Sequence, residues 1–273
     1  MSLRALFELE PHGPDTYVGT GLHYPWGGLY GGHIVAQALR AAASTVEADL
    51  VPHSLRAYFI RRGDHAEPVR YEVDRIRNGR SFATRRVVAR QAIGAILNLE
   101  ASFQRPEQTA DVETVRIPAD IPGPDEVAGE SWSEFFERRF LPGRHRPDDA
   151  RTGAGRATAW LKVSEALGPP DDPTAQLVHR CALAYLSDDL PTDAVLRAHP
   201  SFADADGGAQ FYPASLDHTI WFHREVQADR WHLHDFTCHG YVGGRGLAIG
   251  HVFTGAGIHV ATVAQEVLLR EKR

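Results

Sequence analysis

Two adjacent carboxylates follow an apolar run in the second half of the chain, in the stretch CALAYLSDDLPTD. Residues 173–190 have the apolar spacing of a helix, and Asp188 and Asp189 come near its end, just before Pro191. A carboxylate set against packed core and the negative end of a helix dipole has a raised pKa, which suits a general base at neutral pH. The alternative is that both aspartates end the helix in solvent. Helical periodicity places Asp189 at least as far inward as Asp188, so the pattern does not select Asp188.

A single amide interrupts an apolar row in the last predicted strand, residues 257–271. Gln265 shares one face of that strand with aliphatic side chains: Ala261, Val263, Val267 and Leu269. A buried amide needs hydrogen-bond partners, and Gln265 could orient a water and a carboxylate. The alternative is a structural amide bonded to the backbone.

Ser215 begins another predicted strand, residues 215–224, with His218 three residues further on. Residues three apart on a regular strand point to opposite faces, and the chain has no G-x-S-x-G elbow, so a Ser–His nucleophile is not expected. Ser215 is interpreted as a hydroxyl that binds the water. The alternative is an ordinary strand serine.

A glycine pair lies at the start of the other predicted helix, residues 29–46. Free backbone N–H groups in a first helical turn, here of Gly32 or His33, can bind an oxyanion or a phosphate. The pair does not form a G-x-G-x-x-G sequence after a strand, so a dinucleotide cofactor is not expected. The alternative is a tight turn where helix meets sheet.

Composition argues against several classes of function. The formal net charge of −6 gives no support to non-specific binding of nucleic acid or of an anionic membrane, and no apolar run reaches bilayer-spanning length. The two cysteines form no CxxC pair and fit a reducing cytoplasm. The 15 histidines form no H-E-x-x-H motif, so neither a metal nor another cofactor is expected.

The two halves of the chain share one order of elements, a helix followed by strand-like runs. Gly79-Arg80 matches Gly244-Arg245 at an offset of 165 residues, and the same offset carries Glu100 onto Gln265. Repetition of this kind predicts two copies of one unit. This arrangement suggests an α+β double hotdog, in which each repeat is a helix with a curved antiparallel sheet, and composition alone does not separate it from another α+β fold. Its expected boundaries are residues 1–105 for the first repeat, 106–154 for a linker and 155–273 for the second repeat.

Several blocks of the sequence together resemble the acyl-CoA thioesterase II family, whose members are double hotdogs. In the first half these are GGHIVAQAL, HSLRAYFIRRGD, RNGRSFATRRVVA and ASFQRPE. In the second half they are AYLSD, ASLDHTIWFHR and VATVAQEVLLR. The resemblance places that family's water-activating residues on Asp188, Ser215 and Gln265.

The resemblance implies a cytoplasmic enzyme that hydrolyses acyl-CoA thioesters with a directly activated water. It also implies a homodimer or higher homo-oligomer. The expected small-molecule partner is the acyl-CoA substrate. Two alternatives remain at this point: an acyl-CoA or lipid-binding hotdog protein without turnover, and a hotdog enoyl-CoA hydratase.

Overall fold

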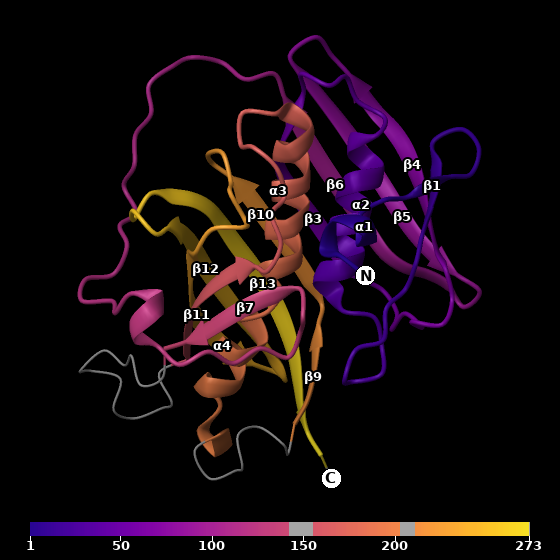
Figure 1. Ribbon diagram of the computed structural model, residues 1–273. Helices are drawn as coiled ribbons and strands as arrows, with labels where there is room; N and C mark the ends of the chain where they lie inside the picture. The colour runs from indigo at the N-terminus through magenta and orange to yellow at the C-terminus, as the bar shows by residue number, and fades with distance from the viewer. Residues whose placement is uncertain (142–154, 203–210, 273) are drawn as a thin grey trace.

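One continuous sheet organises the protein (Figure 1). The computed structural model describes residues 1–141, 155–202 and 211–272. Within these residues the strands follow the order β1-β2-β4-β5-β6-β3-β10-β13-β12-β11-β8-β7, and β9 pairs with β13 beside this path. Every strand pair in the described residues is antiparallel, as expected when hairpins rather than crossover helices connect the strands.

The strands are β1 (Glu10–Pro11), β2 (Thr16–Gly19), β3 (Val51–Phe59), β4 (Val69–Asn78), β5 (Phe82–Gln91), β6 (Gly94–Gln104), β7 (Phe136–Phe140), β8 (Arg156–Val163), β9 (Phe211–Ser215), β10 (Asp217–Phe222), β11 (His232–Val242), β12 (Arg245–Thr254) and β13 (His259–Glu271). The helices are α1 (Leu3–Leu6), α2 (Gly31–Ala43), α3 (Pro173–Leu186), α4 (Pro191–Ala198) and the 3₁₀ turns η1 (Pro124–Glu126) and η2 (Pro200–Phe202). No helix in the described ranges is both long and apolar enough to cross a membrane.

The sheet repeats itself on either side of its central pair, β3 and β10. The order β3-β6-β5-β4-β2 on one side corresponds to β10-β13-β12-β11-β8 on the other. The two halves join where Leu55 lies opposite Ile220. The helices α2 and α3 lie side by side on one face of the sheet (Figure 1). The predicted pair of helix-plus-sheet repeats is therefore confirmed.

The proposed match of Glu100 with Gln265 is wrong by one residue. Both positions lie on corresponding strands, β6 and β13, but Glu100 is exposed whereas Gln265 is buried. Because side chains alternate between the faces of a strand, an odd error in the offset moves a residue to the other face. The turn between β5 and β6 has residues 92–93, whereas the turn between β12 and β13 has residues 255–258. Because the two turns differ in length, no single offset aligns the strands on both sides of them.

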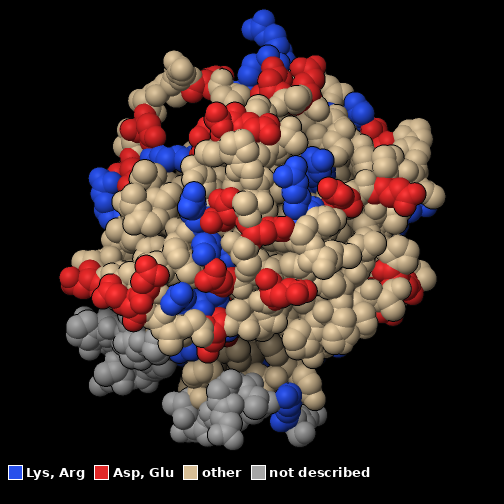
Figure 2. All heavy atoms as spheres, viewed as in Figure 1, with Lys and Arg blue, Asp and Glu red and all other residues tan. Residues whose placement is uncertain are grey.

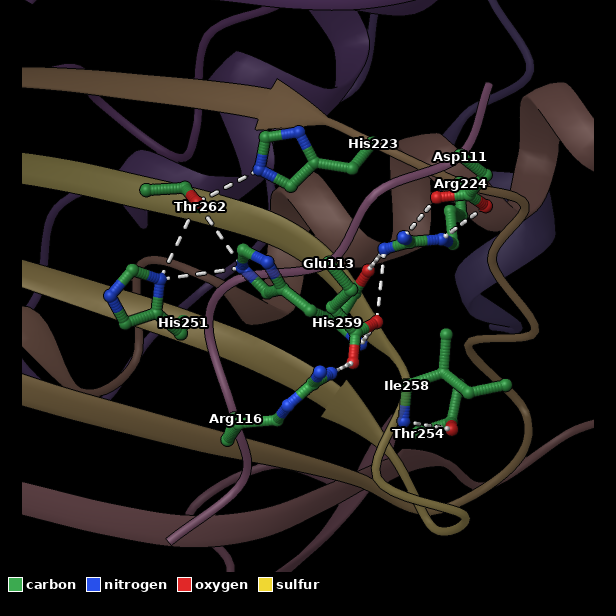
Figure 3. Close-up of polar contacts among 10 residues, drawn as sticks. All are labelled: Asp111, Glu113, Arg116, His223, Arg224, His251, Thr254, Ile258, His259 and Thr262. Carbon is green, nitrogen blue, oxygen red and sulfur yellow. Dashed lines mark hydrogen bonds and ion pairs between the residues drawn. The ribbon is translucent and has the colours of Figure 1, made fainter. Parts of the chain in front are cut away.

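The segment assigned as a linker contributes to the fold. Its strand β7 pairs with β8 and extends the second repeat's sheet, and part of it packs on a small apolar cluster of Leu141, Trp160, Leu233 and Phe253. Arg224 pairs with Asp111 and Glu113, and Glu113 Oε2 also accepts the His259 N–H at 3.0 Å (Figure 3). Residues 142–154 of the predicted linker lie outside the described residues.

Candidate active site

Asp188 lies in the turn that follows α3. The helix ends at Leu186 with Ser187 as its C-cap, and α4 begins at Pro191, so the predicted single helix over 173–190 is interrupted. This turn directs the Asp188 carboxylate to the N-terminus of α2, where the Gly32 N–H donates to Oδ2 at 2.8 Å. The positive end of the α2 dipole thus faces the carboxylate. Helices from both repeats are needed to hold Asp188.

The glycine pair permits this close approach. A Cβ on Gly31 would lie 2.6 Å from Asp188 Oδ2, and a Cβ on Gly32 would lie 2.3 Å from the Tyr185 carbonyl oxygen. Both distances are shorter than a side chain can tolerate. The pair therefore permits the two helices to meet here, whereas the alternative from the sequence was a tight turn between helix and sheet.

Ser215 and Gln265 converge on the same carboxylate. Gln265 Nε2 donates to Ser215 Oγ at 2.8 Å, and Ser215 Oγ lies 3.4 Å from Asp188 Oδ1. Gln265 is fully buried on β13, within the apolar row from which the sequence singled it out. Three residues separated by 27 and 50 positions in the chain thus form one contiguous polar group.

His218 joins this group, contrary to the strand-parity prediction. Ser215 lies opposite Val267, whereas Thr219 lies opposite Ala264, so four residues of one strand span three of the other. The extra residue is a bulge near Leu216, and it turns Ser215 and His218 to the same face. His218 contacts Gln265 Oε1 through Nδ1 and Ser187 Oγ through Nε2, the latter at 2.9 Å. No local sequence signal marks this bulge, so strand alternation places His218 on the wrong face.

The hydrogen bonds fix the protonation of His218. Gln265 uses its amide nitrogen for Ser215, so its oxygen faces His218 and requires a donor. Burial lowers the pKa of His218 to about 4, so the imidazole is neutral and carries its proton on Nδ1. Nε2 lies 2.9 Å from Ser187 Oγ, whose hydroxyl is also 3.1 Å from the Ala184 carbonyl oxygen. The donors run in one direction, from His218 through Gln265 and Ser215 to Asp188.

Burial raises the pKa of Asp188 to about 7. Hydrogen bonds from Gln265, Gly32 and Ser215 oppose this increase, and the negative charge of Asp189 adds to it. Loss of hydration is the larger effect, because a buried carboxylate loses the water that stabilises its charge. The carboxyl therefore titrates near neutral pH.

The side chain of Asp189 is also buried, so the interpretation that both aspartates end the helix in solvent is wrong. Its side chain is 2% exposed and pairs with Arg138 Nη1 at 3.2 Å. Trp132 Nε1 donates to Asp189 Oδ1 at 2.6 Å. Helical periodicity predicts that Asp189 points inward, and it does so. Its partners, however, differ from those of Asp188. Both partners come from the segment expected to be a linker, within its aromatic stretch SWSEFFERRF.

The two backbone candidates of α2 differ in what they contact. The Gly32 N–H is engaged by Asp188. His33 lies in the same first turn, and its buried imidazole Nδ1 is 3.1 Å from the Tyr24 hydroxyl. Burial lowers the pKa of His33 to about 4, so its ring is neutral.

The other histidines that the structure describes form no recognisable metal centre. Within the described residues, no group of three or more His, Cys, Asp or Glu side chains is arranged to hold a metal ion. His223, His251 and His259 gather around the Thr262 hydroxyl at 2.9, 3.4 and 3.2 Å (Figure 3). His232 and His234, which share a strand face, are buried, and burial lowers the pKa of His234 to about 3.

Both halves of the chain match known domains. Residues 22–104 match the acyl-CoA thioesterase N-terminal domain, and residues 110–269 match the acyl-CoA thioesterase C-terminal domain. The chain belongs to the acyl-CoA thioesterase family. As an acyl-CoA thioesterase it is a hydrolase that cleaves acyl-CoA thioesters to carboxylic acid and coenzyme A.

Relatives of this thioesterase cover nearly the whole chain. Acyl-coenzyme A thioesterase 8 of Rattus norvegicus is 31% identical, over 98% of this chain and 88% of its own length. Acyl-CoA thioesterase 2 of Haemophilus influenzae is 32% identical, over 89% and 87%. The crystal structure of acyl-CoA thioesterase II TesB2 from Mycobacterium marinum superposes with a TM-score of 0.84 at 34% identity, covering 99% of this chain and 98% of that one. The double-hotdog fold expected from the sequence is thereby confirmed.

Proposed function

We propose that Asp188 is the general base of thioester hydrolysis and that Ser215 and Gln265 hold the attacking water. The observation that carries this proposal is the convergence of these three side chains at the N-terminus of α2, with the Asp188 pKa raised to about 7. A base is most effective when its pKa lies near the working pH. A carboxylate with an ordinary pKa would be a much weaker proton acceptor.

The proposed reaction proceeds without an acyl-enzyme. The water oxygen attacks the thioester carbonyl carbon while its proton passes to Asp188. The tetrahedral intermediate then collapses, the carbon–sulfur bond breaks, and the coenzyme A thiolate leaves with the electron pair. Protonation of the thiolate and loss of the proton from Asp188 restore the enzyme. Gly32 has already donated its N–H to Asp188, so we propose the neighbouring His33 N–H as the remaining candidate donor to the oxyanion.

Ser215 itself is the competing nucleophile, because its hydroxyl contacts the base directly. The two mechanisms differ in what Ser215→Ala does. If Ser215 only positions water, the variant keeps a measurable fraction of its turnover, and the native enzyme shows no burst of thiol release. A stoichiometric burst in the native enzyme, together with complete loss of turnover in Ser215→Ala, would establish a covalent mechanism. Ser54→Ala is the control, since Ser54 precedes Leu55 in the first half of the chain as Ser215 precedes Leu216 in the second.

We also propose that the enzyme is a cytoplasmic homo-oligomer. Unpaired Cys181 and Cys238 fit a reducing compartment. Tyr58 and Trp221, which are 46% and 44% exposed on the central strands, offer apolar surface for a second copy. Basic and acidic side chains are interspersed on the face shown in Figure 2, which favours neither nucleic acid nor an anionic membrane as partner. Light scattering on the purified enzyme tests the assembly, and a monomer mass across micromolar concentrations would contradict it.

A further inference from the structure

A second buried carboxylate stands directly beside the proposed base. Asp189 faces away from Gly32, Ser215 and Gln265, and its own partners are Arg138 and Trp132. Arg138 Nη1 lies 3.2 and 3.3 Å from the two Asp189 oxygens. One guanidinium nitrogen thus contacts both carboxylate oxygens, and charge-assisted contacts of this kind are stronger than neutral hydrogen bonds.

The surroundings of this ion pair keep water away. Trp132 and Tyr30 have ring centroids 5.1 Å apart, and Tyr30 and Tyr185 have centroids 4.9 Å apart. The Tyr30 hydroxyl donates to the Tyr185 carbonyl at 2.9 Å, immediately below the turn that carries both aspartates. In such a poorly hydrated environment, a charge acts on its neighbours more strongly than it would in water.

Other ionisable groups also face the two aspartates. Glu130 lies 3.2 Å from Arg138 Nη2, and Asp193 of α4 lies 4.0 Å from Arg138 Nη1. Burial raises the pKa of Asp193 to about 6. Arg197 of α4 acts on Asp193, while Tyr30, Tyr185 and neutral His218 complete the set of titratable groups around the turn. Arg138 is therefore the cation that touches Asp189 itself, amid an excess of acids.

We propose that Arg138 is a positioning residue for catalysis: its ion pair neutralises the carboxylate next to Asp188 and so allows Asp188 to ionise as the base. This inference rests on the proposed role of Asp188. It assigns a function to β7, the strand that the segment between the repeats supplies. Burial raises the Asp189 pKa, and Arg138 opposes that increase. Without Arg138, two adjacent buried carboxyls would compete for one negative charge, and Asp188 would ionise less readily.

The test is the pH dependence of kcat/KM for acyl-CoA hydrolysis in Arg138→Met, Asp189→Asn and the double variant. The acid limb is the part of this profile where kcat/KM falls as the pH is lowered. We expect the midpoint of the acid limb to move up by about one pH unit in Arg138→Met and to move down in Asp189→Asn. In the double variant, which removes both charges, the limb should return to within about half a unit of the native position. A loss of folding alone would not produce this reversal, because all three variants would simply lose activity in parallel.

Arg139 provides the matched control. It neighbours Arg138 on β7, but it donates to the Val127 carbonyl at 2.8 Å and lies over the Trp231 ring. Arg139→Met should leave the acid limb unchanged, and Arg138→Lys, which keeps the charge, should leave it within about half a unit. An unchanged or lowered limb in Arg138→Met, or no recovery in the double variant, would overturn the inference. If Arg138→Met does not fold, an unchanged limb in Asp189→Asn is sufficient to overturn it.

Asp188→Asn separates this inference from the proposed function. If Asp188→Asn retains native kcat, the assignment of the base fails. If Asp188→Asn is inactive while Arg138→Met keeps the native acid limb, only the role of Arg138 fails.

Discussion

His218 and Gln265 face each other between β10 and β13, and the imidazole Nδ1–H donates to the amide Oε1. This contact determines which end of the amide points to Ser215. Were the amide reversed, its oxygen would compete with the serine oxygen for a proton, and its NH₂ group would face His218. The orientation of the proposed water-binding amide thus depends on a residue that does not touch the water.

Removing the Asp188 carboxylate should slow turnover with little effect on binding. We expect Asp188→Asn to lower kcat by roughly 10²–10⁴, the range typical for loss of a general base, with KM nearly unchanged. Gln265→Ala should cost less, roughly 10–10³ in kcat, because Ser215 and Asp188 remain to hold the water. Steady-state thiol release measures both variants. A selective increase in KM would show that these residues bind substrate instead.

The rate should depend on pH through the ionisation of Asp188. Because the base must be deprotonated and its pKa is raised to about 7, kcat/KM should fall below about pH 7 and level off above it. The acid limb of the native enzyme, measured in well-buffered solutions of constant ionic strength, gives this pKa directly. An acid limb near pH 4 would mean that the reacting carboxylate is well hydrated, contrary to the burial of Asp188.

Asp188 should also cost the enzyme stability at alkaline pH. Its folded-state pKa lies above the unfolded value, so the fold favours the protonated form, and stability declines as pH rises through about 7. Asp188→Asn removes this cost and should stabilise the protein by about 1–4 kcal/mol at pH 8 but by little at pH 4. Chemical denaturation at the two pH values provides the comparison. Equal effects at both would contradict the proposed ionisation.

The contact between His218 and Gln265 predicts that two substitutions of His218 differ in kcat. His218→Leu leaves the Gln265 oxygen without its donor and should lower kcat by roughly 10–10², with KM little changed. His218→Asn supplies an amide donor near the Nδ1 position and should recover much of this loss. His223→Leu, further along the same segment, is the control and should retain native kcat. A loss that Asn does not relieve would indicate a packing role.

Hydrolysis should not require a metal ion. The proposed water-activating groups are a carboxylate, a hydroxyl and an amide, and no described cluster is arranged to bind a metal. Prolonged incubation with EDTA should leave kcat unchanged. Loss of activity that zinc restores would redirect attention to His223, His251 and His259, which surround one hydroxyl (Figure 3).

The sequence predicted the repeats and part of the site, for identifiable reasons. Gln265 could be found because an amide in an aliphatic row is conspicuous on a regular strand. Asp188 was chosen by family resemblance alone, since helical periodicity favours Asp189 at least as strongly. The role of His218 was hidden by one inserted strand residue, which reverses the face of every position beyond it. Arg138 was missed because its ion pair joins segments 51 residues apart in the chain.

The junction of the two repeats makes each dependent on the other. The first repeat contributes the Gly32 N–H, and the second contributes Asp188, Ser215 and Gln265. In a duplicated protein one repeat can lose its role in the site, but here both repeats contribute groups to it. A substitution that tilts α2 in the first repeat would displace a carboxylate encoded some 156 residues downstream. A substitution in either repeat can therefore disturb the same group of side chains, although each repeat has the outline of a separate fold.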